Sequence, residues 1–146
     1  YKKIFIASKS KHQIVLWPNI DAGSDKISKV IRELREKNKN TKITFYKNFL
    51  PDDFVVLIKN ADLLIGNSSS FIREGSTLGI PTILVGIRQE GRDLGKNILK
   101  HINVDKLPVM DLVVNYEKMH KSSDYGTGNS GRKISEKIIK FLDKQL

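Results

Sequence analysis

The residues best suited to chemistry lie between residues 66 and 93, where hydroxyl, carboxylate and guanidinium groups are interleaved with glycine. They are three consecutive serines, one glutamate and two arginines: Ser68, Ser69, Ser70, Glu74, Arg88 and Arg92. Serine hydroxyls donate to phosphate oxygens, and arginine binds phosphate through two parallel donors. A glutamate has the wrong sign for phosphate, but its carboxylate can accept from a pair of ribose hydroxyls. Together these groups favour a nucleotide site.

Strand-like and helix-like segments alternate around this stretch. Short apolar runs predict strands at residues 13–17, 43–46, 63–65 and 82–85. Apolar residues at three- and four-residue spacing predict four helices. The first is capped by Ser24 or Asp25, the second opens at Pro51, the third runs from residue 70 to 78, and the fourth is capped by Asn129 or Ser130. Parallel strands need crossover connections, so the alternation predicts an α/β fold with a doubly wound parallel sheet of Rossmann-like type.

The pattern is weaker in three other regions. Residues 1–9 fit either a strand or a helix, and residues 97–103 favour a short strand. Residues 106–120 favour a helix interrupted near Pro108, and residues 122–131 predict a loop.

The predicted fold brings the chemical groups together. In open α/β sheets, ligands bind beyond the carboxyl ends of the strands, where helix N-termini also converge. The serines fall at such a strand-to-helix junction, where unpaired N–H groups and the helix dipole favour an anion. The two arginines follow the next strand and line the same cleft. Each feature also has a purely structural interpretation, because serines are common N-caps and glycine-rich arginine loops are common turns. The glycines match neither GxGxxG nor GxxxxGK[ST].

Composition limits the partners. The 146 residues suit a single domain, residues 1–146, and the missing initiator Met suggests a piece of a longer chain. The net charge of +10 indicates an anionic partner, but no zinc-finger or RNA-recognition signature is present, so we expect a small anionic ligand and no nucleic acid. No apolar run approaches the roughly 20 residues that span a bilayer, so we expect no membrane partner. The absence of cysteine favours a reducing, cytoplasmic location. No ligand spacing indicates a metal or cofactor.

Three stretches resemble a known family: WPNIDAGS (residues 17–24), IGNSSSFIREGSTLGIPTILVGIRQEGR (residues 65–92) and YGTGNSGRKISEKIIKFL (residues 125–142). They look like the second half of the hydrolysing UDP-N-acetylglucosamine 2-epimerases, and the resemblance covers residues 15–142. It implies the second, UDP-binding domain of a two-domain glycosyltransferase-B type fold. The first domain of the same chain, upstream of this sequence, is then a partner, and we expect the full-length protein to be a homo-oligomer.

The resemblance also implies residue roles. Ser68 and Ser69 would bind the pyrophosphate, and Glu74 the ribose hydroxyls. Arg88 would lie near the phosphates and the sugar as the catalytic group of this half. The remaining contacts to the UDP-sugar would come from Gln89 and Arg92 near the phosphates, Phe49 near uracil, and Asn19 and Asp21 facing the sugar. Where the family often has Gly after its serine pair or one residue later, this chain has Ser70 and Phe71, and Phe71 is available to pack beneath the turn.

The implied reaction eliminates UDP from UDP-N-acetylglucosamine and hydrates the resulting glycal to N-acetylmannosamine. It needs a base and an acid. His12, His101 and His120 lie outside the recognised motifs, so we expect the acid–base groups upstream and an inactive isolated fragment. Two alternatives stay open: a UDP-sugar-dependent glycosyltransferase of the same fold, and a non-catalytic nucleotide-binding module. Related enzymes also act on UDP-diacetamido-trideoxy sugars.

Overall fold

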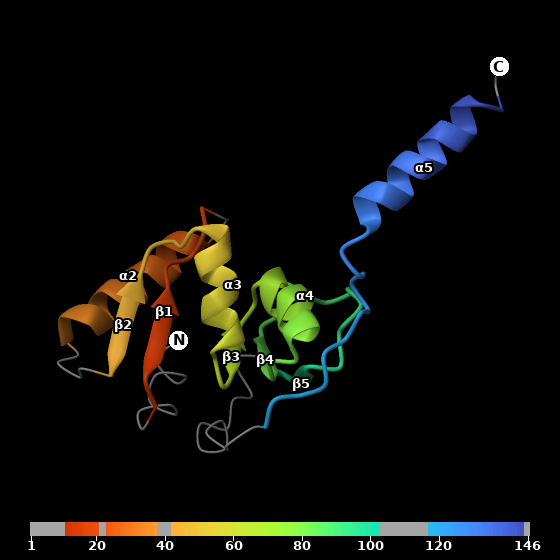
Figure 1. Ribbon diagram of the computed structural model, residues 1–146. Helices are drawn as coiled ribbons and strands as arrows, with labels where there is room; N and C mark the ends of the chain where they lie inside the picture. The colour runs from red at the N-terminus through yellow and green to blue at the C-terminus, as the bar shows by residue number, and fades with distance from the viewer. Residues whose placement is uncertain (1–10, 21–22, 38–41, 103–116, 145–146) are drawn as a thin grey trace.

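The structure is a computed structural model that describes residues 11–20, 23–37, 42–102 and 117–144 (Figure 1). Its elements follow in the order β1 (Gln13–Leu16), α2 (Ser24–Lys37), β2 (Ile43–Tyr46), α3 (Pro51–Lys59), β3 (Leu64–Gly66), α4 (Ser69–Leu78), β4 (Thr82–Val85), β5 (Ile98–Ile102) and α5 (Ser130–Leu142). The α/β class is confirmed, and so are the strand at residues 98–102 and the four helices in the described ranges. Residues 1–9, predicted as a strand or a helix, and residues 106–116, most of a predicted helix, lie outside the described residues. The end of that predicted helix, residues 117–120, is described and is not helical.

The described strands are all parallel and form two sheets. In the first sheet β1 pairs with β2, with Gln13 opposite Ile43 and Leu16 opposite Tyr46. In the second, β4 lies between β3 and β5, with Gly66 opposite Leu84. The parallel arrangement agrees with the prediction, but no described strand of the first sheet pairs with a strand of the second, so the described strands do not form one continuous sheet.

Local sequence signals explain where the helices begin and end. Pro51 occupies the first turn of α3, where its fixed φ suits a helix and its missing N–H is not needed. Gly79 ends α4 in the left-handed conformation, with φ of 70°, and its N–H contacts the oxygens of Gly75 and Ser76. A Cβ at Gly79 would also collide with the backbone oxygen of Met119. Residue 79 must therefore be glycine for two reasons: its positive φ, and the close approach of the backbone at Met119.

The hydrophobic core lies between α3, α4 and the second sheet. Ile58, Leu64 and Ile80 are buried together, and partly buried side chains surround them: Phe54, Ala61, Phe71 and Leu78. The ring of Phe71 packs against Gly66 at the end of β3. A Cβ built on Gly66 would lie only 3.0 Å from the Phe71 Cε2 atom. The apolar run that forms β4 is buried from Thr82 to Leu84. This core fixes α4 against the strands whose ends carry the serines and arginines.

The C-terminal part of the chain has two sections. Residues 117–125 run beside α4, whereas α5 extends away from the sheets (Figure 1). All of its residues are exposed, including the apolar positions Ile134, Ile138, Ile139, Phe141 and Leu142. Within the described ranges, no helix has the length and apolar character needed to cross a membrane.

Candidate functional site

The serine cluster forms the N-terminus of α4. Ser68 is the N-cap, in extended backbone conformation, and its Oγ accepts a hydrogen bond of 3.3 Å from the backbone N–H of Ser70. The helix begins at Ser69, one residue earlier than predicted. Since the Ser68 hydroxyl uses a lone pair in this contact, its own hydrogen is still available to donate. The three half-buried serines thus surround a helix end whose N–H groups and dipole favour an anion.

The loop after β4, residues 86–95, carries both arginines and lies beside the serine junction. Gln89 is only 3% exposed, and its Nε2 donates a hydrogen bond of 2.6 Å to the backbone oxygen of Asn67. Asn67 immediately precedes the N-cap Ser68, so this bond ties the loop to the start of α4. The prediction that Gln89 contacts the ligand stays untested. In this structure its amide group joins the two loops.

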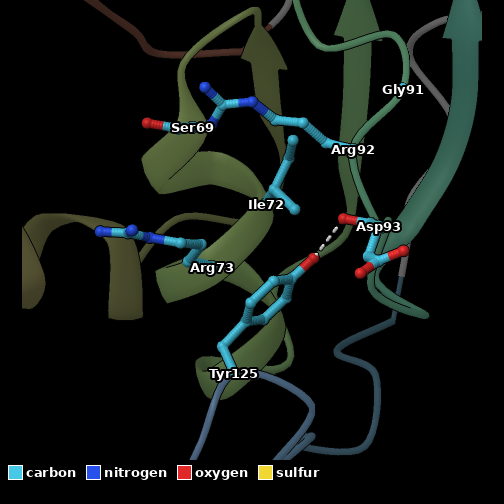
Figure 2. Close-up of a pocket in the computed structure, with 7 residues that line it drawn as sticks. All are labelled: Ser69, Ile72, Arg73, Gly91, Arg92, Asp93 and Tyr125. Atoms are coloured by element: carbon cyan, nitrogen blue, oxygen red, sulfur yellow. Dashed lines mark hydrogen bonds between the residues drawn. The ribbon is translucent and has the colours of Figure 1, made fainter.

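A cavity of about 360 Å³ lies between α4 and the arginine loop. Its lining residues are Ser69, Ile72, Arg73, Gly91, Arg92, Asp93 and Tyr125 (Figure 2). Figure 2 shows the side chain of Arg92 extending from the loop toward Ser69 in the first turn of α4. The structure therefore brings a predicted hydroxyl and a predicted guanidinium to one opening, as an anion site requires.

The other cavity residues were not predicted as site residues from the sequence, and Arg73 and Tyr125 are the two with polar groups on α4 and on the C-terminal segment. Arg73 lies one turn after Ser69 on α4, so its position on the same helix face follows from the helical period. Tyr125 comes from the C-terminal segment, and its hydroxyl donates a hydrogen bond of 2.6 Å to the backbone oxygen of Asp93. Burial, together with the nearby charges of Asp93 and Asp124, raises the pKa of Tyr125 above its ordinary value. The hydroxyl therefore keeps its proton and donates at neutral pH.

Glu74 has an unusual environment for a carboxylate on a helix. Its side chain is about a third exposed, and Oε1 lies 4.0 Å from Arg73 Nη2. Its other oxygen, Oε2, is buried and accepts no hydrogen bond from the part of the chain that the structure describes. A buried acceptor without a partner costs about 1–3 kcal/mol. Glu74 does not line the cavity described above, so its role toward ribose stays a prediction.

A buried amide holds this helix in place. Asn97 is 1% exposed, and its Nδ2 lies 2.9 Å from the oxygen of Phe71, 3.0 Å from Thr82 Oγ1 and 3.2 Å from the oxygen of Ile80. These contacts join the start of β5 to α4 and β4. Asn97 stands at the beginning of a predicted short strand, and nothing in its local sequence indicates that its side chain is buried.

The other predicted site residues lie elsewhere. Arg88 is exposed on the same loop as Arg92 but does not line the cavity. Asn19 is exposed after β1, and Phe49 follows β2, with its ring 4.8 Å from that of Tyr46. Both belong to the loops of the first sheet, outside the cavity. Asp21 lies outside the described residues. Among the residues that are described, no three His, Asp or Glu side chains gather as a metal site would require.

Parallel strands, intervening helices and a capped helix N-terminus at the strand ends place the chain among Rossmann-like α/β proteins. The family model described as UDP-N-acetylglucosamine 2-epimerase matches residues 3–139, and the chain belongs to that family.

Curated relatives agree with this assignment. The chain is 33% identical over 132 residues to a UDP-N-acetylglucosamine 2-epimerase of Neisseria meningitidis, covering 89% of this chain and 34% of that protein. It is 30% identical over 131 residues to a hydrolysing UDP-N,N'-diacetylbacillosamine 2-epimerase of Legionella pneumophila, covering 88% of this chain and 33% of that protein. It is 34% identical over 92 residues to the polysialic acid biosynthesis protein P7 of Escherichia coli, covering 62% of this chain and 23% of that protein. The chain spans about a third of the length of the first two relatives.

Proposed function

We propose that this chain is the UDP-binding domain of a two-domain, hydrolysing UDP-N-acetylglucosamine 2-epimerase that supplies N-acetylmannosamine for sialic-acid-type sugars. In the first step, a base removes the proton from C2 while the C1–O bond breaks and UDP leaves with the bonding electrons. The product is a 2-acetamidoglucal. In the second step, water adds across the double bond, with hydroxyl at C1 and a proton at C2 on the opposite face.

The observation that carries this proposal is the shared position of the serine cap and the arginine loop. The bond from Gln89 Nε2 to the Asn67 oxygen joins the two loops, and Ser69 and Arg92 line one cavity. Breaking the C1–O bond develops negative charge on the β-phosphate. Hydroxyl, helix N–H and guanidinium groups fixed around that charge stabilise the transition state.

Each residue has a separate role in the proposal. Ser68 and Ser69 bind the pyrophosphate, and Arg92 neutralises it from the opposite side. Arg88, near the phosphates and the sugar, assists departure of UDP. The Oε2 atom of Glu74, which accepts no hydrogen bond from the described residues, accepts from the ribose hydroxyls.

The acid–base chemistry is assigned to the other domain. His12 is exposed, with its Nε2 2.9 Å from Thr44 Oγ1, and His120 is exposed in the C-terminal segment. Neither lines the cavity. The coverage of about a third of the relatives supports a division of the active site between two domains. The absence of cysteine supports a cytoplasmic location, and the homo-oligomeric state stays a prediction.

A second substrate is supported by one finding. The Legionella relative is named for a UDP-diacetamido sugar, and its identity to this chain is close to that of the Neisseria relative. We therefore propose UDP-N,N'-diacetylbacillosamine as the alternative substrate of the same reaction.

Product analysis of the full-length protein tests the function. Each UDP-sugar is incubated in deuterated water, and the released sugar is followed by NMR. Free N-acetylmannosamine, or the corresponding diacetamido sugar, with deuterium at C2 and no acceptor present is the expected result. Sugar transfer that needs an acceptor would indicate a glycosyltransferase, and UDP binding without sugar release would indicate a non-catalytic module. The isolated chain is expected to give no turnover; measurable epimerase activity from it would refute the division between domains.

A further inference from the structure

The C-terminal segment, residues 117–125, is attached to α4 by its backbone. The N–H of Met119 donates a hydrogen bond of 2.8 Å to the oxygen of Gly79, and the N–H of Ser122 donates one of 3.1 Å to the oxygen of Ser76. Both acceptors belong to the C-terminal end of α4, where Gly79 is the C-cap and the Ser76 oxygen also contacts the Gly79 N–H. The segment therefore has a fixed course along the helix that carries the serine cap.

This course places Tyr125 against the arginine loop. Its hydroxyl donates a hydrogen bond of 2.6 Å to the backbone oxygen of Asp93, and its ring lines the cavity with Arg92 and Ser69 (Figure 2). Asp93 directly follows Arg92 in the chain. A bond that fixes the Asp93 backbone therefore limits the positions open to the Arg92 side chain.

The same loop is fixed at a second point by the Gln89–Asn67 hydrogen bond. Each of the two anchored residues is next to an arginine, because Gln89 follows Arg88 and Asp93 follows Arg92. Between the anchors, Gly91 adopts a positive φ of 76°, and a Cβ there would have no atom of the described residues within 4 Å. The loop also makes two turn hydrogen bonds of its own, from the Glu90 N–H to the Ile87 oxygen (3.0 Å) and from the Arg92 N–H to the Gln89 oxygen (3.4 Å), so the two anchors attach a preformed turn to its neighbours.

We propose that Tyr125 is a positioning residue that clasps the arginine loop to α4 and holds Arg92 ready for the diphosphate of a nucleotide ligand. The proposal rests on the proposed function, because it assigns a role in that same UDP site. The physical reason is preorganisation. A loop ordered before the ligand arrives does not lose its conformational entropy on binding, so the affinity is higher.

The test compares Tyr125→Phe with the unaltered full-length protein. This change keeps the ring and removes only the donating hydroxyl. We expect the dissociation constant for UDP to rise roughly threefold to tenfold, the effect of one net hydrogen bond. The matched control is Ser135→Ala, which removes a hydroxyl-to-carbonyl hydrogen bond of 2.8 Å in α5, far from the loop in the chain. The control is expected to leave UDP affinity unchanged.

A double-mutant cycle separates positioning from direct contact. If Tyr125 acts through Arg92, Tyr125→Phe has no further effect on UDP affinity in a protein that already carries Arg92→Ala. Equal losses in both backgrounds would mean that Tyr125 contacts the ligand itself or acts on the whole fold. Equal losses would therefore overturn the proposal, whichever of these two explanations holds.

Hydrogen exchange without ligand gives a readout independent of UDP. Backbone amides of residues 87–95 are expected to exchange about three- to tenfold faster in Tyr125→Phe, while those of β4 keep their protection. Unchanged exchange in the loop would overturn the clasp even if UDP binding is found. If the unaltered protein fails to bind UDP, the proposed function fails with it, and the exchange result still decides whether the clasp exists.

Discussion

The side-chain amide of Gln89 donates a hydrogen bond of 2.6 Å to the backbone oxygen of Asn67. These two residues belong to the loops that follow neighbouring parallel strands, β4 and β3. Because the carboxyl ends of parallel strands meet at one edge of a sheet, the bond brings the arginine loop to the serine-capped start of α4. The candidate site depends on this relationship, and the residues that maintain it can be tested separately from those that would touch a ligand.

Asn97 is expected to contribute strongly to stability. Its buried Nδ2 atom lies close to the oxygens of Phe71 and Ile80 and to Thr82 Oγ1. Asn97→Ala removes these contacts, and the Thr82 hydroxyl, which lies near both backbone oxygens, can donate to one of them at a time. We expect the free energy of unfolding to fall by about 2–3 kcal/mol, measured by urea denaturation. The control Asn60→Ala removes an amide that donates 2.8 Å to Val56 at an exposed helix end, and should cost less than about 1 kcal/mol. Equal losses in the two variants would show that burial of the Asn97 amide is unimportant.

Gly79 should be intolerant of any side chain. Gly79→Ala combines the strain of a positive φ with a collision against the Met119 oxygen, so we expect a loss of about 3 kcal/mol or more. Gly128 has a similar φ of 81° but open space around it. Gly128→Ala should therefore cost only about 1–2 kcal/mol. Thermal unfolding of both variants measures the difference, and similar midpoints would contradict the close approach of the C-terminal segment to α4.

The raised pKa of Tyr125 gives a dependence on pH with a definite sign. Burial is the main cause, and the charges of Asp93 and Asp124 add to it. Because the folded-state pKa lies above the ordinary value of 10.0, the contribution to stability is complete below that pH and is lost as pH rises through the folded-state value. We expect the difference in unfolding free energy between the unaltered protein and Tyr125→Phe to be constant up to about pH 9 and to shrink above pH 10. A difference that grows with rising pH would have the wrong sign.

Much of α4 and its surroundings could be predicted from the sequence, because the signals are local. Serines precede the helix, and Gly79 and Pro81 end it before an apolar strand. Asn97 and Tyr125 were not found, because their contacts join distant parts of the chain. Tyr125 and Asp93 are 32 residues apart, and Asn97 and Phe71 are 26 apart. No periodicity or spacing in one sequence indicates which distant backbone oxygen a polar side chain will reach.

The assignment of Glu74 to ribose can be tested with the nucleotide itself. In the unaltered protein, UDP is expected to bind more tightly than 2'-deoxy-UDP by roughly threefold to tenfold, because the carboxylate accepts from both ribose hydroxyls. In Glu74→Gln, which keeps the size of the side chain and removes its charge, that preference should fall to near unity. Calorimetric titration of both nucleotides measures it. A preference for UDP that survives the substitution would assign the ribose contact to another residue.

The central claim is that the serine cap of α4 and the carboxylate one turn further on bind UDP. Calorimetric titration of the full-length protein with UDP tests it most directly, in Ser68→Ala and Glu74→Ala. Their matched controls in α5 are Ser135→Ala and Glu136→Ala, the second of which removes a Glu–Arg pair 3.8 Å apart. We predict that each site variant weakens UDP binding by roughly tenfold, because each removes one charge-assisted hydrogen bond. Both controls should bind UDP like the unaltered protein. Unchanged affinity in both site variants would contradict the assignment.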